Sequence, residues 1–360
     1  MLYNILVPFS RDITLLNIFR YITFRSASAL IFALIFTILT GPWFLKKLSE
    51  LKVGQPILHY VPEHLGKAGT PTMGGLLIIA GAVSSTLLWA DLSNVFIWLT
   101  LFVFLGFGLV GFIDDYTKIR HRENRGLSPR AKMLGLFLVS ALAVSLLLLQ
   151  PAYDTRLAVP FFKQFMPDLG LFYMVFAVIV LLASSNAVNL TDGLDGLAIL
   201  PFVMCCMVYA VFIYVAGHAS FASYLQVPSV PGVGEVAVFC SALMGAGLGF
   251  LWYNCFPAQV FMGDVGALSL GGVLGFLAVL CKQELMLIVA GGVFVVETLS
   301  VILQVGFFKV SHGKRLFRMT PIHHHFQKGE HPLPESKIIV RFWIVSVLLA
   351  IMSLSVLKIR

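Results

Sequence analysis

Two adjacent carboxylates stand where an apolar stretch of the sequence ends. Asp114 and Asp115 directly follow the apolar run 108–113. Paired carboxylates at a nonpolar edge repel each other and lose hydration, so a cation or a proton must compensate them. Mg²⁺ prefers hard oxygen ligands and commonly bridges carboxylates to substrate phosphates. The pair indicates either a magnesium site for phosphate chemistry or a polar helix end at a membrane surface.

A second motif combines amide and carboxyl groups with glycine turns. Asn189, Asp192 and Asp195 recur every third residue, which would place them on one side of a helical turn. Two Asp-Gly pairs in the same stretch also permit turns whose backbone approaches a ligand. Such a segment can bind sugar hydroxyls or a base, supply oxygen ligands to a metal, or form a solvated turn.

Two more segments carry aromatic and imidazole groups. Phe261 can stack on a planar base, and Asp264 offers a carboxylate for a metal three residues later. The consecutive His323, His324 and His325 would point about 100° apart on a helix, which disfavours zinc binding by all three. Near phosphates, imidazoles can donate hydrogen bonds or add positive charge. A solvated polar loop is the alternative interpretation of the histidine run.

Three isolated polar residues complete the candidate groups. Lys67 can reach a phosphate or the edge of a base, although a lysine that sets membrane orientation explains it equally well. Asn254 begins the polar segment that ends at Asp264. Glu297 lies deep inside an apolar stretch, where a charge costs about 2.5–3.5 kcal/mol on insertion scales. We therefore expect Glu297 to be protonated, paired or turned toward the protein interior.

The elements that position these groups are membrane spans. Of 360 residues, 59% are hydrophobic and 12% are charged, against roughly 25% charged in an average soluble domain. The net charge of +8 does not indicate nucleic-acid binding, because the basic residues occupy short loops between apolar stretches. The five cysteines lack metal-ligand spacing. No shift in composition marks a second domain, so we predict a single integral-membrane domain over residues 1–360.

The apolar stretches predict an all-α polytopic membrane protein with about ten transmembrane helices. A bilayer core about 30 Å thick needs roughly 20 apolar residues per helix. On this criterion the expected spans lie near 26–45, 74–90, 94–113, 133–150, 171–188, 197–216, 236–253, 265–280, 285–308 and 338–357. Gly291 and Gly292 lie inside the ninth span.

The distribution of lysine and arginine predicts the orientation of these spans. Loops after odd-numbered spans carry 16 of these residues, whereas the opposite side, termini included, carries 8. The positive-inside rule then places the odd loops in the cytoplasm and both termini in the periplasm. All four polar motifs follow odd spans, so we expect them to meet at the cytoplasmic face in one site.

These motifs resemble those of the phospho-N-acetylmuramoyl-pentapeptide transferases, a branch of the polyprenyl-phosphate N-acetylhexosamine-1-phosphate transferases. The resemblance covers essentially the whole chain, and the triple histidine favours the muramyl-pentapeptide branch. It is carried by Lys67-Ala-Gly-Thr-Pro-Thr-Met-Gly-Gly75, Asp114-Asp115, Asn189-Leu-Thr-Asp-Gly-Leu-Asp-Gly196, Phe261-Met-Gly-Asp264 and Pro321-Ile-His-His-His325.

The resemblance implies a Mg²⁺-dependent reaction at the bacterial inner membrane. UDP-MurNAc-pentapeptide would donate phospho-MurNAc-pentapeptide to undecaprenyl phosphate, giving lipid I and UMP. Asp264 would bind the metal, while Asp114 would act as base on the lipid phosphate with help from Asp115. A dimer is expected by the same analogy, as is a broken ninth span that opens a lipid-facing groove.

The resemblance also implies roles for the remaining motif residues in binding the nucleotide substrate. Four residues would form the uridine pocket, with the aromatic ring stacked on uracil: Lys67, Asp195, Asn254 and Phe261. Asn189 and Asp192 would lie near the nucleotide or the metal. The three histidines would lie near the substrate's phosphates or sugar.

Two other functions fit parts of the pattern. A sister transferase acting on UDP-GlcNAc would share the acidic motifs and differ around the loop that carries the histidines. An ion-coupled transporter would instead bind its cargo near the middle of the bilayer. Among the candidate groups Glu297 alone is that deep, so the pattern favours an enzyme.

Overall fold

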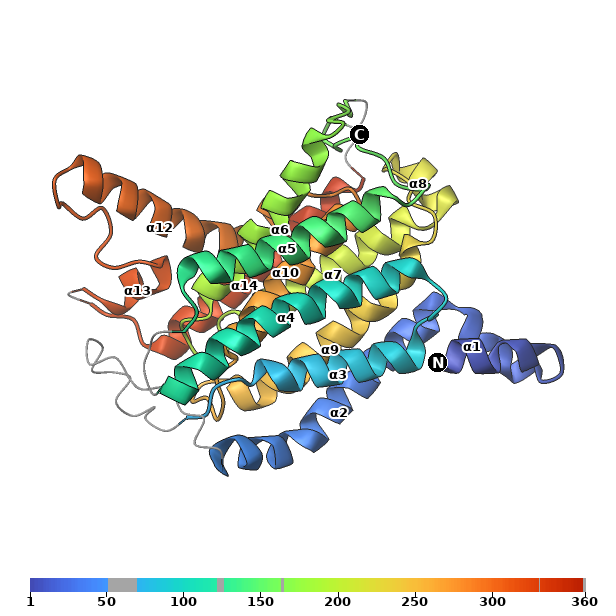
Figure 1. The fold of residues 1–360 in the computed structure, drawn as a ribbon, viewed down its shortest axis with the longest axis horizontal. Coiled ribbons are helices and arrows are strands. Elements are labelled where there is room, and N and C mark those ends of the chain that lie inside the picture. Colours follow the sequence, from blue (N-terminus) through green and yellow to red (C-terminus); the bar gives the residue numbers. More distant parts are fainter. Residues whose placement is uncertain (51–69, 122–125, 163–164, 330, 359–360) are drawn as a thin grey trace.

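The computed structural model describes residues 1–50, 70–121, 126–162, 165–329 and 331–358, and the regular elements within them are helical (Figure 1). Nine of the described helices are long and apolar enough to cross a membrane. They are α2 (Ile22–Glu50), α4 (Val95–His121), α5 (Pro129–Leu148), α6 (Phe172–Thr191), α7 (Ile199–Ala216), α9 (Val236–Asn254), α10 (Gly263–Leu280), α12 (Gly292–Val310) and α14 (Glu335–Val356). The prediction of an all-α polytopic membrane protein is confirmed.

The second expected span, 74–90, corresponds to the shorter helix α3 (Gly75–Trp89). Its 15 residues extend about 22 Å at 1.5 Å per residue, less than the bilayer core. It packs against α2 and α9, and its residues Leu77 and Ile78 are buried. Packing inside the bundle explains how a helix of this length is accommodated.

Helix α10 forms the centre of the bundle, and every residue from 265 to 280 is buried. It packs mainly against α4 and α6. Small residues allow this close approach: Gly271 lies against the backbone of Ser184 and Ser185 on α6, and the Ser184 hydroxyl donates to the Gly271 carbonyl at 2.7 Å. Lipid provides little hydrophobic drive for helix association, so such small-residue contacts and hydrogen bonds hold the helices together. The first residues of α10 carry the Asp264 motif, which this packing fixes in place.

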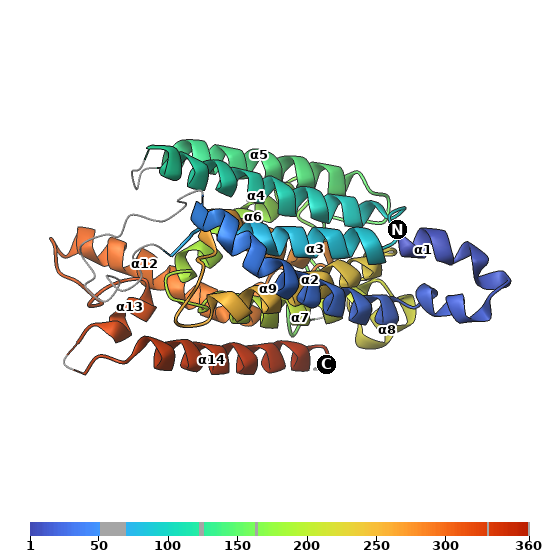
Figure 2. The same ribbon diagram turned by 90° about the horizontal axis from the view of Figure 1, so that it is seen from below.

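The ninth span is broken at the two glycines identified from the sequence. A short helix, α11 (Leu287–Ala290), ends at Gly291, and α12 begins at Gly292. Figure 1 shows α12 leaving the direction of the bundle, while α14 lies along one side of it in Figure 2. Only 22% of the apolar window of α12 is buried, against 89% for α10. The break that the resemblance implies is therefore present, and it leaves most of α12 facing outward.

The chain ends lie at the end of the bundle opposite the short helix α13 (Ile322–Gln327) (Figure 2). The N-terminal residues form α1 (Leu2–Leu6), η1 (Pro8–Arg11) and η2 (Thr14–Arg20) there, followed further along the chain by α8 (Ala219–Leu225) and η4 (Val233–Glu235).

A buried ion pair joins elements at this end. Arg25 on α2 makes two hydrogen bonds to Glu235, one of them at 2.9 Å, and the two residues are 2% and 7% exposed. The backbone N–H of Asp91 donates to the same carboxylate at 2.7 Å. The pair links the start of α2 to the start of α9 and to the loop after α3.

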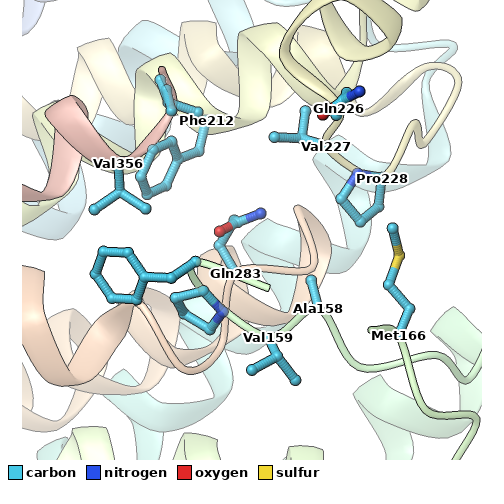
Figure 3. Close-up of a pocket in the computed structure, with 12 residues that line it drawn as sticks. Ala158, Val159, Met166, Phe212, Gln226, Val227, Pro228, Gln283 and Val356 are labelled. Atoms are coloured by element: carbon cyan, nitrogen blue, oxygen red, sulfur yellow. The ribbon is translucent and has the colours of Figure 1, made fainter. Parts of the chain in front are cut away.

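An apolar cavity opens at the same end, among residues 158–161, Met166, α7 and the end of α14. Figure 3 shows side chains such as Phe212, Val227, Gln283 and Val356 around it. Its lining has no ionisable side chain and none of the residues singled out from the sequence. The chemistry must therefore be sought at the other end of the bundle.

Candidate active site

Three carboxylates from two motifs meet at the end of the bundle away from the termini. Asp114 and Asp115 lie in the last turns of α4, and Asp264 lies in the first turn of α10. Each offers an oxygen within 4.8 Å of the others. Asp114 and Asp115 are buried, whereas the side chain of Asp264 is 16% exposed. Residues 149 positions apart in sequence thus form one acidic cluster, as the sequence predicted.

Two lysines compensate this acidic cluster. The Lys118 ammonium lies 2.7 Å from both Asp114 Oδ2 and Asp264 Oδ2, and 3.5 Å from Asp115 Oδ1. Lys132, on α5, lies 2.9 Å from Asp264 Oδ2. The sequence had assigned both lysines only to membrane orientation. The missed signal is helical spacing, because Lys118 follows Asp114 by one turn and must share its face.

Neutral donors hold the three carboxylates in place. The backbone N–H of Leu127 donates to Asp114 at 2.7 Å, and that of Val265 donates to Asp115 at 3.1 Å. The Asn189 amide donates to Asp264 Oδ1 at 2.6 Å, so one residue of the second motif enters the cluster directly. Each carboxylate therefore has a fixed orientation before any substrate is present.

A glycine is required beside Asp115. Gly263 has a φ of +74°, and a Cβ at this position would lie 2.6 Å from Asp115 Oδ2. Only glycine combines this left-handed conformation with such a close approach. The Met262-Gly263-Asp264 turn thus brings the third carboxylate against the other two.

Backbone hydrogen bonds join the segment before α3 to the segment before α10. Phe261 N donates to the Pro71 carbonyl at 2.8 Å, and Gly74 N donates to the Phe261 carbonyl at 2.8 Å. The Phe261 ring is half-buried and three residues from Asp264. Lys67 lies outside the described residues, so its predicted position remains a prediction.

The 189–196 segment ends α6 and forms a turn beside the cluster. Asp192 is half-buried there. Burial, reinforced by the carboxylates around it, raises the pKa of Asp192 to about 8.

Asp195 and Asn254 connect this turn to the segment after α9. Asp195 accepts a hydrogen bond from the backbone N–H of Ala258 at 3.0 Å. Asn254 accepts from the Gly196 N–H at 3.0 Å and donates to the Val260 carbonyl at 2.8 Å. Both side chains are buried and bind backbone groups, so they hold the segment before Phe261 against the 189–196 turn.

The three histidines lie on α13 and have different partners, as the angular spacing predicted. His323 is fully buried, with Nδ1 3.1 Å from Glu297 Oε2. His324 pairs with Gln327 at 2.7 Å, and His325 accepts from the Arg318 N–H at 3.2 Å. The expectation that Glu297 is paired is confirmed. In the described part of the chain, these histidines do not converge on a metal site.

The donor set of the acidic cluster fits a divalent cation bound together with phosphates. Three carboxylates provide the hard oxygen ligands that Mg²⁺ prefers, and Lys118 and Lys132 can neutralise phosphate oxygens beside it. Phosphoryl transfer depends mainly on such positioning and charge neutralisation. The arrangement is therefore suited to moving a phosphoryl group at the end of a membrane-embedded bundle.

Two family models match this chain. The model for glycosyl transferase family 4 matches residues 97–282, which include Asp114, Asp115 and Asp264. The signature described as phospho-N-acetylmuramoyl-pentapeptide-transferase signature 1 matches residues 67–79. Together the matched regions contain the acidic cluster and the segment that hydrogen-bonds to Phe261.

Proteins similar to this chain along its entire length carry the name phospho-N-acetylmuramoyl-pentapeptide-transferase. One from Maridesulfovibrio salexigens is 64% identical over 362 residues, and one from Nitratidesulfovibrio vulgaris is 64% identical over 360 residues. A more distant one from Syntrophus aciditrophicus is 54% identical over 362 residues. In each case the similarity covers 100% of both chains.

Proposed function

This chain belongs to the phospho-N-acetylmuramoyl-pentapeptide transferases, membrane enzymes of peptidoglycan synthesis, and we propose that it makes lipid I. In this reaction phospho-MurNAc-pentapeptide passes from UDP-MurNAc-pentapeptide to undecaprenyl phosphate, and UMP is released. The observation that carries the proposal is the acidic cluster with its two lysines at one end of the membrane-spanning helices. The phosphate group of a lipid acceptor would lie at this end of the helices, at the membrane surface.

The acidic cluster would hold Mg²⁺, with Asp264 as its principal ligand. When bound, the ion neutralises developing charge on the phosphates. Asp114 would take the proton of the lipid phosphate, with Asp115 supporting it, and Lys118 would bind a phosphate oxygen. In this proposal the lipid phosphate attacks the donor phosphate directly, without a covalent aspartyl intermediate. Trapping of a phosphorylated Asp114 or Asp115 in a single turnover would contradict direct attack.

The nucleotide would bind between the 189–196 turn and Phe261. We assign the uridine pocket to Lys67, Asp195, Asn254 and Phe261. The hydrogen bonds of Asp195 and Asn254 to the neighbouring backbone support this assignment, since they fix both side chains beside the segment that leads to Phe261. Asn189 and Asp192 would lie near the nucleotide or the metal, and the three histidines His323, His324 and His325 would lie near the substrate's phosphates or sugar.

The orientation proposed is cytoplasmic for the site and periplasmic for both termini, in the bacterial inner membrane. Two observations support it: the described chain ends lie at the end opposite α13, and the basic loops lie on the side of the acidic cluster. UDP-linked substrates are made in the cytoplasm, which is consistent with this direction. Self-association into a dimer is part of the same proposal.

The decisive test is UMP release by the purified protein in detergent with Mg²⁺ and undecaprenyl phosphate. UDP-MurNAc-pentapeptide and UDP-GlcNAc are offered separately. We expect release with the muramyl peptide alone. Release with UDP-GlcNAc alone would assign the protein to the sister branch, and substrate-dependent proton flux in liposomes without UMP release would favour transport.

Metal removal should stop the reaction reversibly. The acidic cluster carries three carboxylates against two ammonium groups, so phosphates cannot approach it favourably without a further cation. EDTA should reduce UMP release to background, and excess Mg²⁺ should restore it, whereas Ca²⁺ should restore less because it favours longer bonds and higher coordination numbers. Full activity in EDTA after exhaustive dialysis would contradict the assignment of the cluster as a metal site.

A further inference from the structure

A buried acid–imidazole pair links the broken ninth span to the site. Glu297 lies on α12 and His323 on α13, and both side chains are 0% exposed. The 3.1 Å contact between Glu297 Oε2 and His323 Nδ1 is the one hydrogen bond of the Glu297 side chain within the described residues. A buried carboxyl group is costly unless it is paired, so this contact anchors the imidazole ring to α12.

The other edge of the imidazole faces the turn between Asp192 and Asp195. A Cβ atom at Gly193 would lie 2.5 Å from His323 Nε2, so the imidazole ring packs directly against this residue. Nε2 is buried and has no hydrogen-bond partner among the described residues. Gly193 does not have a positive φ there, so its lack of a side chain serves the close approach of the ring.

We propose that Glu297 is a positioning residue that acts through His323 on the Asp192–Asp195 turn. The Glu297 carboxyl group hydrogen-bonds to His323 Nδ1 and so fixes the imidazole ring. The ring in turn packs against Gly193 and fixes the position of the turn. The inference rests on the proposed function, because that function assigns Asp192 and Asp195 to the nucleotide substrate. The proposal also gives His323 a role different from that of His324 and His325, which hydrogen-bond to Gln327 and Arg318.

The first test is a double-mutant cycle. Glu297→Ala should lower kcat/KM for UDP-MurNAc-pentapeptide by about 10–100-fold, by analogy with the loss of a carboxylate that orients a metal-bound histidine. Glu297→Gln keeps an oxygen that can accept from Nδ1 and should recover most of the loss. If Glu297 acts through His323, the Glu297→Ala/His323→Ala variant should be no worse than His323→Ala alone.

A second variant tests the contact from the other side. Gly193→Ala places a methyl group against a ring that cannot move away, so the turn must shift and substrate affinity should fall. Truncating the ring in Gly193→Ala/His323→Ala should remove that clash, leaving activity close to that of His323→Ala. Glu284→Ala is the matched control, because Glu284 is also a buried carboxylate, bonded to Tyr173 at the opposite end of the bundle. It should lower stability without changing kcat/KM of the folded protein.

Substrate binding provides a readout that does not depend on transfer. The affinity for UDP-MurNAc-pentapeptide, measured calorimetrically without lipid acceptor, should fall in Glu297→Ala and Gly193→Ala and recover in Glu297→Gln. Wild-type affinity in Glu297→Ala, or losses that multiply in the double variant, would overturn the positioning role. A wild-type protein that neither binds the nucleotide nor releases UMP would instead overturn the proposed function.

Discussion

Asp264→Asn should reduce UMP release by about 10³-fold or more. A metal ion supplies several kcal/mol of charge stabilisation to a phosphoryl-transfer transition state, and each 1.36 kcal/mol corresponds to a tenfold change in rate. Asp264 is the member of the acidic cluster that contacts both lysines and Asn189. The substitution keeps the shape of the side chain but removes the charge on which these contacts converge. Steady-state UMP release with both substrates saturating measures the loss.

The control for this variant is Asp168→Asn. Asp168 is an exposed carboxylate just before α6, at the end of that helix opposite Asn189, and its loss should leave activity unchanged. The thermal unfolding midpoint of Asp264→Asn is measured alongside, because the amide oxygen can accept from the lysines or from Asn189 but not from both, which should lower the midpoint without unfolding the protein. Retention of more than a tenth of wild-type activity in a folded Asp264→Asn protein would contradict the metal-ligand assignment.

Glu235→Ala should destabilise the folded protein by about 3–5 kcal/mol, the range for breaking a buried ion pair by removing one partner. Arg25 is 2% exposed, and the substitution would leave its guanidinium without a counter-charge. The guanidinium lies 4.4 Å from the centre of the Tyr3 ring and can bond to the Trp89 carbonyl, but neither contact supplies a negative charge. Unfolding by SDS titration in mixed micelles, followed by tryptophan fluorescence, gives the free energy.

A variant that removes both charges separates the ion pair from the packing around it. Arg25→Met/Glu235→Leu should lower the free energy of unfolding much less than Glu235→Ala does, because no uncompensated charge remains buried. The exposed pair Lys47–Glu50 is the matched control, and Glu50→Ala should change stability by less than about 1 kcal/mol. Equal losses in Glu235→Ala and the double variant would mean that packing, and not charge, accounts for the effect. Because the pair lies at the end opposite the acidic cluster, the folded fraction of each variant should turn over normally.

The sequence predicts the helices and the side on which the motifs meet, because both follow from coarse properties. Apolar length determines where spans such as 94–113 fall, and the odd–even order of spans determines which loops share an end of the bundle. The family resemblance implies the break in the ninth span, and Gly291 and Gly292 mark its position, since residues without side chains weaken a helix in its interior. These predictions need no knowledge of which helix packs against which.

The details that the sequence does not reveal depend on tertiary packing. Lys132 is distant in sequence from Asp264, and only the packing of α5 beside α4 brings its ammonium group to the carboxylate. The Glu297–His323 contact likewise depends on how α13 folds back over α12. Lys118 is different, because its spacing from Asp114 within one helix made the contact predictable.

The outward course of α12 affects the concentration scale on which each of the two substrates saturates the enzyme. Its apolar side chains, such as Leu299, Ile302 and Leu303, are about half exposed, so a long isoprenoid tail can stay among the lipids while its phosphate reaches the cluster. The nucleotide substrate then binds from the aqueous phase, whereas the lipid acceptor reaches the site by diffusion within the membrane. The saturation of the enzyme by its acceptor follows the mole fraction of that lipid in the bilayer or micelle, and added detergent dilutes the acceptor while leaving the nucleotide concentration unchanged.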